Sequence, residues 1–127
     1  MTEPRRWVAF LAAALLAACA APQTEVVRTG TQVYAPTTDV DLLEQAPSRA
    51  YTEIGVIDAP GEAGALRAQV LAQVRDKARQ LGADAVILTD QSRRAPTTQR
   101  LNPTTGYYET VGGQLIPAFK GVAIKYR

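Results

Sequence analysis

The sequence predicts a single small α+β domain in which one amphipathic helix packs on a mixed sheet of four or five strands. Apolar residues recur at spacings of three or four between residues 63 and 81, the period of a helix with one buried face. Runs rich in β-branched residues flank this stretch at 51–58 and 84–90. These patterns predict the element order β-β-α-β-(hairpin)-β over residues 39–127.

The N-terminal segment has the form of a secretory signal. Arg5 and Arg6 precede twelve uncharged residues, 7–18, a run too short to cross a bilayer as a helix. It closes with a tetrapeptide that resembles the lipobox of bacterial lipoproteins, Leu16-Ala17-Ala18-Cys19. The resemblance implies a signal peptide over 1–18 and acylation of Cys19. The alternatives are a plain signal peptide or a buried helix with a chance cysteine.

The residue after the cysteine bears on the membrane that holds the anchor. In lipoproteins of enteric-type bacteria, an aspartate at this position tends to retain the protein at the inner membrane. Ala20 stands here instead. The resemblance therefore implies an outer-membrane protein that faces the periplasm, attached through the lipid on Cys19.

The stretch after the anchor is predicted to be a flexible tether over residues 19–38. It is rich in Ala, Pro, Gln, Thr and Gly and has little periodicity. An edge strand, formed by Val26 and Val27 or by Val33 and Tyr34, is the alternative.

Two strands are predicted before the helix. Val40–Gln45 has an apolar centre, and Tyr51–Asp58 is rich in β-branched residues, with a proline turn between them. We expect these two runs to pair as an antiparallel hairpin. Gly55, inside the second run, predicts a bulge or close packing by another element.

The helix is the clearest element of the sequence. Glu62 suits its positive N-terminal end, and Gly82 suits the left-handed residue that follows its C-terminal end. One apolar stripe is predicted to cover the sheet, formed by Ala63, Leu66, Val70, Val74, Ala78 and Leu81. Asp84–Asp90, with four consecutive apolar residues, then predicts a buried central strand reached by a right-handed parallel crossover.

The last part of the chain is predicted to carry an insertion at 92–118 before a final strand. Ser92–Thr105 is polar and predicts a mobile loop, and Tyr107–Ile116 predicts a hairpin that turns at Gly112 and Gly113. Gly121–Tyr126 is then expected to return antiparallel beside the central strand.

Three strings carry a resemblance to a known group of proteins. They are a Tyr-x-x-Ile-Gly string ending at Gly55, the run Leu81-Gly-Ala-Asp-Ala-Val86, and the closing Gly121–Tyr126. Together they look like small bacterial envelope lipoproteins that share a β-α-β-β unit, most of which have no assigned activity. The unit is similar to the C-terminal domain of the lipoprotein sensor of the Rcs envelope-stress pathway. Disulfides brace that sensor, whereas Cys19 is the only cysteine here, so the resemblance implies the fold alone.

The composition excludes several kinds of function. The chain has no histidine and one cysteine, which excludes Ser-His-Asp and Cys-His catalysis, imidazole metal ligands and an intramolecular disulfide. The net charge of +2 is too weak to indicate nucleic-acid binding. Removal of residues 1–18 would leave 127 − 18 = 109 residues without Met, Trp or His. We expect no cofactor and no enzymatic activity.

Acidic residues are the remaining candidates for catalysis or metal binding. Asp39, Asp41 and Glu44 cluster near the first predicted strand and could bind a hard cation. Asp58 and Glu62 flank a turn and could act as the carboxylate pair of a glycosidase. Solvated strand and turn positions are the preferred interpretation for these side chains. Asp84, which precedes the apolar run of the central strand, is expected to hydrogen-bond loop backbone.

A basic and aromatic set in the insertion is the preferred contact surface. Arginine and tyrosine are enriched in recognition hot spots. This set could contact anionic lipid headgroups, peptidoglycan or an envelope protein, with a solvated loop as the alternative. It comprises Arg93, Arg94, Arg100, Tyr107 and Tyr108.

The sequence thus predicts a non-enzymatic envelope interaction or structural module anchored in the outer membrane. The alternatives are a carboxylate-based enzyme that acts on the cell wall and a lipoprotein that binds a small ligand or cation.

Overall fold

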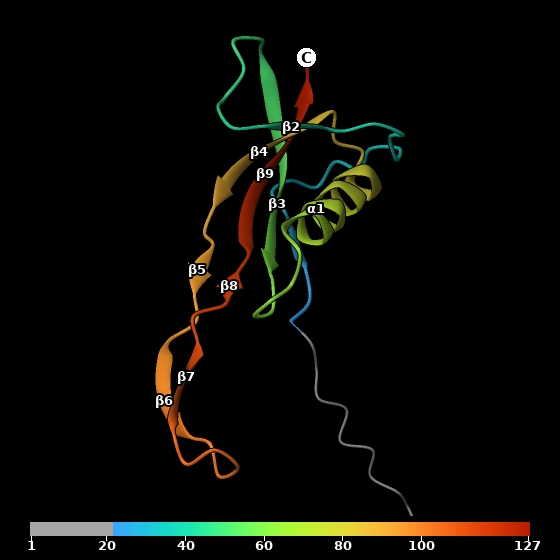
Figure 1. Cartoon of the computed structure of the whole chain (residues 1–127). Coiled ribbons are helices and arrows are strands. Elements are labelled where there is room, and N and C mark those ends of the chain that lie inside the picture. The colour runs from blue at the N-terminus through green and yellow to red at the C-terminus, as the bar shows by residue number, and fades with distance from the viewer. Residues whose placement is uncertain (1–21) are drawn as a thin grey trace, which may run out of the picture.

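One helix covers one face of a five-stranded sheet, and a long β-hairpin projects from the end of that sheet (Figure 1). The computed structural model describes residues 22–127, so the predicted signal peptide and the predicted acylation site at Cys19 lie outside the described residues. The elements are β1 Glu25–Arg28, β2 Asp41–Leu43, β3 Tyr51–Pro60, α1 Arg67–Leu81, β4 Ala85–Asp90, β5 Arg93–Arg94, β6 Thr97–Leu101, β7 Tyr108–Gly112, β8 Leu115–Ile116 and β9 Ala118–Tyr126. The predicted single small α+β domain with a mixed sheet is confirmed.

The last strand lies at the centre of the sheet. The strand order is β1-β3-β9-β4-β2, and β9 runs antiparallel to both of its neighbours. The strands β3 and β4 therefore run parallel to each other, with α1 as the connection between them. The predicted antiparallel return of the C-terminal strand beside the central strand is confirmed, and so is the parallel relation across the helix.

The predicted hairpin of the first two strands is wrong. Strand β2 pairs in parallel with β4 at the opposite edge of the sheet, with Asp41 opposite Ala85. Both sides of β3 are already occupied, by β1 and by β9. The buried side chain of Val40 fixes the segment at its new edge. The competition for the sides of β3 is a long-range effect that local sequence patterns do not contain.

The predicted tether is wrong where the structure describes a strand, and the alternative of an edge strand is confirmed there. Glu25–Arg28 forms β1 and pairs antiparallel with the end of β3. Val26 and Tyr34 pack against the core, and the Thr37 hydroxyl donates to the Ala83 carbonyl at 2.6 Å. The folded domain therefore begins before residue 39.

The helix is shorter at its N-terminus than predicted. It begins at Arg67, after Glu62, Ala63 and Leu66. Ala63 and Leu66 are exposed rather than on the buried stripe. Gly64 adopts φ +80°, and its N–H donates to the Leu115 carbonyl at 3.0 Å, so this segment turns toward the hairpin instead of continuing the helix. Four predicted stripe residues are buried as expected, namely Val70, Val74, Ala78 and Leu81.

The C-terminus of the helix follows the prediction. Gly82 is left-handed, with φ 80° and ψ 25°, and its N–H donates to the Arg79 carbonyl at 3.0 Å. The predicted irregularity at Gly55 is also present, because the register between β3 and β9 shifts between Glu53 and Gly55. The core lies between the helix and the sheet, and its largest fully buried side chains include Phe119, Ile57, Ile124, Val74 and Val86.

The insertion is one continuous hairpin rather than a loop followed by a hairpin. The strands β4 and β9 lead into β5 paired with β8, and then into β6 paired with β7. The predictions of a mobile loop over Ser92–Thr105 and of a turn at the glycine pair are wrong. The chain reverses at 102–107, where the Asn102 N–H donates to the Tyr107 carbonyl at 2.8 Å. We call residues 93–116 the arm and residues 100–108 its tip.

Local chemistry explains why the arm turns where it does. The Asn102 side-chain oxygen accepts a hydrogen bond from the Thr104 N–H at 2.9 Å, as asparagine does in tight turns, and Gly106 has φ +75°. Gly112 and Gly113 have φ values of 98° and 76°. They lie between the two paired segments of the arm. Their positive φ values therefore interrupt the strand pairing and do not reverse the chain.

Candidate functional site

All five residues of the predicted contact surface lie on the arm and are exposed. Arg93 and Arg94 form β5, Arg100 lies on β6, and Tyr108 begins β7 directly after Tyr107. The tyrosine side chains are 76% and 72% exposed. The structure thus places the whole set on one projecting element, outside the body of the domain (Figure 1).

The arm does not gather these residues into one patch. Successive side chains of a strand point to opposite faces, and residues directly opposite each other share a face. Tyr108 stands opposite Leu101, whereas Arg100 stands opposite Glu109, so these two pairs occupy different faces. Tyr107 lies in the turn just before β7, outside the paired residues.

Sequence reasoning missed three exposed apolar residues of the arm. Leu101 is half exposed beside Tyr108, Val111 is exposed on the face of Arg100, and Leu115 is exposed on β8. Leu101 and Val111 are each isolated between residues that are not apolar, the pattern of a solvated ribbon. With these residues included, the arm carries apolar side chains on both of its faces.

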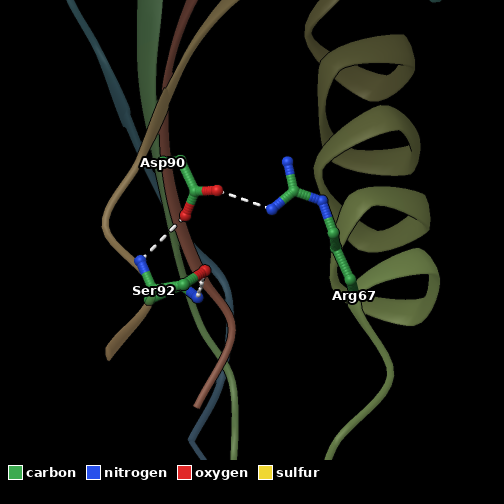
Figure 2. Close-up of polar contacts among 4 residues, drawn as sticks. Arg67, Asp90 and Ser92 are labelled. Atoms are coloured by element: carbon green, nitrogen blue, oxygen red, sulfur yellow. Dashed lines mark hydrogen bonds and ion pairs between the residues drawn. The ribbon is translucent and has the colours of Figure 1, made fainter. Parts of the chain in front are cut away.

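A polar cluster fixes the root of the arm to the helix. Figure 2 shows the Asp90 carboxylate between Arg67 and Ser92. One carboxylate oxygen accepts a hydrogen bond from the Arg67 guanidinium at 2.5 Å, and the other accepts from the Ser92 N–H at 2.9 Å. The Ser92 hydroxyl in turn accepts from the Ala118 N–H at 3.1 Å. The Arg67 guanidinium also lies 4.7 Å from the centre of the Phe119 ring. Both strands that lead into the arm are therefore tied at its root.

This cluster changes the acidity of Asp90. Hydrogen bonding to Ser92, and then to Arg67, lowers the pKa of the Asp90 carboxyl from 3.8 to about 2. A lowered pKa means that the folded protein is stabilised by the charged form. The stabilisation is present above the ordinary carboxyl pKa and is lost as the pH falls through about 2.

We expect Asp90→Asn to lower the free energy of unfolding at neutral pH by less than about 1 kcal/mol, because an exposed ion pair is screened by water. The Asp90 side chain is 44% exposed. Urea unfolding should show the difference from the native protein at neutral pH, and the difference should shrink from about pH 4 to about pH 2. Asp58→Asn, an exposed carboxylate on β3, controls for the loss of one charge. A difference that stays constant over this range would contradict the expectation.

The other acidic candidates do not form a metal centre in the described part of the chain. No group of three or more Asp, Glu, His or Cys residues among residues 22–127 is placed to hold an ion. Asp84 accepts a hydrogen bond from the Tyr126 N–H at 2.9 Å and pairs with Lys125 at 3.2 Å. Its predicted bond to backbone is confirmed, although the donor belongs to β9 and not to a loop.

A hollow of about 400 Å³ lies between the start of the described chain and the helix. The Thr24 hydroxyl donates to the Gln73 side-chain oxygen across it at 2.8 Å. The lining is mainly polar and consists of Pro22, Gln23, Thr24, Gln73, Asp76, Lys77 and Gln80. Because it opens where the described residues begin, it does not define a site. The arm is therefore the candidate functional site.

Comparison with protein-family models, with curated proteins and with solved structures finds no match. Within residues 22–127 there is no helix of the length and apolarity needed to cross a membrane. The function must be argued from the arm and the sequence.

Proposed function

We propose that the protein is a non-enzymatic lipoprotein of the outer membrane that faces the periplasm and binds another component of the envelope through its arm. The observation that carries this proposal is the arm itself, whose paired strands β6 and β7 are exposed along their whole length. The membrane attachment rests on the lipobox that ends at Cys19.

A purely structural role does not account for the arm. A two-stranded hairpin without other packing is at best marginally stable in water. Strand β6 pairs with β7 in a two-stranded ladder that is separate from the five-stranded sheet. Exposed apolar and aromatic side chains at the tip would gain stability when a partner covers them. The ribbon is therefore typical of a contact element.

The charge of the arm favours an anionic partner. Arg93, Arg94 and Arg100 stand against Glu109 alone, so the arm carries 3 − 1 = +2. Arg94 donates to the Gly113 carbonyl at 3.2 Å, and Glu109 accepts from the Asn102 side chain at 2.5 Å. Arginine beside tyrosine is a common composition for recognition surfaces.

The carboxylates favour a non-enzymatic role. A glycosidase needs a carboxyl whose pKa is raised, so that it can act as an acid at neutral pH. Burial in an apolar pocket is what raises the pKa of such a carboxyl. Asp58 and Glu62 are both exposed, and Glu62 borders a hollow of about 200 Å³.

We expect a thiol at the tip to react slowly with a maleimide in intact cells. Thr104→Cys lies at the turn of the arm, and an acylated Cys19 would leave it as the only free thiol. A bound partner should slow its labelling several-fold relative to the detergent-solubilised protein. The readout is the time course of the mass shift in cells and in detergent.

Two variants control this experiment. Val33→Cys places a thiol at an exposed position next to Tyr34, which contacts the helix C-terminus, and it should react equally fast in both conditions. Cys19→Ala combined with Thr104→Cys should leave the membrane fraction. Equal labelling of the tip in cells and in detergent would rule out a partner on the arm.

A further inference from the structure

The chain enters the sheet at the same end from which the arm leaves it. Glu25, the first residue of β1, is opposite Asp58 on β3. Asp58 is opposite Lys120 on β9, and Lys120 is opposite Thr89 on β4. Glu25 and Thr89 therefore lie at the same level of the sheet, one residue before the end of β4. Figure 1 shows the start of β1 and the arm at one end of the molecule, with the C-terminus at the other.

The arm is longer than the chain that separates this level from the anchor. Six residues lead from Cys19 to Glu25, which reach at most about 20 Å when fully extended. Twelve residues lead from Thr89 to Leu101, which span about 40 Å at the rise of a β-strand. The arm is curved, so about 40 Å is the upper limit of this span (Figure 1). With Cys19 held in a bilayer, an arm that points the same way meets the bilayer surface before the connecting chain is fully extended.

The chemistry of the tip suits a lipid–water interface. Leu101 and Tyr108 share one face of the ribbon, and Val111, next to the tip, lies on the other face with Arg100. Tyr107 is exposed at the turn. Tyrosine is enriched where membranes meet water, and arginine is attracted to anionic headgroups. The groove of a protein partner would cover one face of the ribbon, whereas an interface surrounds both. Apolar side chains on both faces therefore favour lipid.

We propose that the tip of the arm inserts into the headgroup region of the bilayer that holds Cys19, at a surface that contains anionic phospholipid. This inference rests on the proposed function, because it requires the acyl anchor. The anchor keeps the tip close to the surface, so even a weak contact is highly populated. The domain is then attached to the membrane at two points, which fixes its orientation.

The test uses a single tryptophan at the tip of the mature, lipidated protein. Trp7 is the only tryptophan of the sequence and leaves with the signal peptide, so an introduced tryptophan is the only one in each variant. Tyr107→Trp reports on the tip, and Val33→Trp is the matched control, because the native side chains are 76% and 73% exposed. The proteins are reconstituted into vesicles of phosphatidylethanolamine and phosphatidylglycerol that contain lipids brominated near the headgroup. We expect strong quenching and a blue-shifted emission for the tip, and neither for the control.

A further pair of variants separates insertion from mere proximity. Leu101→Ser combined with Tyr108→Ser, in the Tyr107→Trp protein, removes the apolar side chains of one face without changing the charge. Quenching should fall toward that of the control. Phosphatidylcholine vesicles should also give weaker quenching, since the attraction of Arg100 to anionic headgroups is then lost.

The outcomes distinguish this inference from the proposed function. Equal quenching at positions 107 and 33 in the acylated protein would overturn lipid insertion. If the tip thiol is nevertheless protected in cells, the proposed function stands and the partner is a protein or peptidoglycan. A mass spectrum that shows an unacylated Cys19 would overturn both.

Discussion

Phe119→Ala is expected to lower the free energy of unfolding by about 3–5 kcal/mol, the range for loss of a buried aromatic side chain. Phe119 is 1% exposed and lies on β9, opposite Ala59 on one side and Asp90 on the other. The substitution leaves a cavity in the core and removes the ring on which the Arg67 guanidinium rests. Urea unfolding followed by circular dichroism measures the loss.

Two control substitutions show whether burial is the cause. Val27→Ala changes a residue that is 64% exposed and should alter stability by less than about 0.5 kcal/mol. Phe119→Leu keeps much of the volume and should cost less than the alanine variant. If Phe119→Ala and Val27→Ala destabilise the protein equally, the assignment of Phe119 to the core is wrong.

Gly82→Ala should lower the free energy of unfolding by about 2–4 kcal/mol, the second largest effect, because backbone strain and a steric clash add. Gly82 is left-handed, with φ +80°, and a Cβ there would lie 2.5 Å from the Ala35 carbonyl oxygen and 2.7 Å from the Tyr34 Cβ. An L-residue in this conformation is strained, and the segment at residues 34–35 would have to move away from the helix end. Thermal and urea unfolding of the variant measure the sum of the two costs.

Gly64→Ala separates these costs. Gly64 has the same φ of +80°, but nothing lies within 4 Å of a Cβ built on it. It should therefore cost only the conformational part, about 1–2 kcal/mol. The difference between the two variants measures the close approach of the segment before β2 to the helix end. Equal costs would show that this approach does not constrain the protein.

The elements that the sequence predicts well are those defined by neighbouring residues. The period of α1, its end at Gly82 and the apolar run of β4 are local patterns, and each is found where it is expected. The predicted helix start is wrong because the Gly64 N–H bonds to the Leu115 carbonyl, which is distant in sequence. The predicted partner of β2 is wrong for a similar reason, since the pairing depends on which strands already flank β3.

The candidate site was predictable in composition but not in shape. Exposed arginines and tyrosines can be read from a polar stretch without apolar period. Their distribution over two faces depends on the register of β6 and β7, which the turn at 102–107 sets. Gly112 and Gly113 are a strong local signal for a turn, and Asn102 with Gly106 is a second one. Only the pairing of the whole hairpin decides which of the two reverses the chain.

Because β1 is an edge strand, the distance between the membrane and the folded domain should depend on the force on the N-terminal connection. If Cys19 carries the proposed acyl anchor, a pull on it enters the sheet through β1. Strand β1 forms four ladder pairs with β3, whereas β9 forms nine with β3 and six with β4. The weaker ladder should separate first and leave the centre of the sheet intact. The next fixed point is Tyr34, which packs against the core. The connection would then lengthen from six residues to fifteen, or from about 20 to about 50 Å. Strand β1 would therefore detach first under load, and the connection to the membrane would lengthen while the core stays folded.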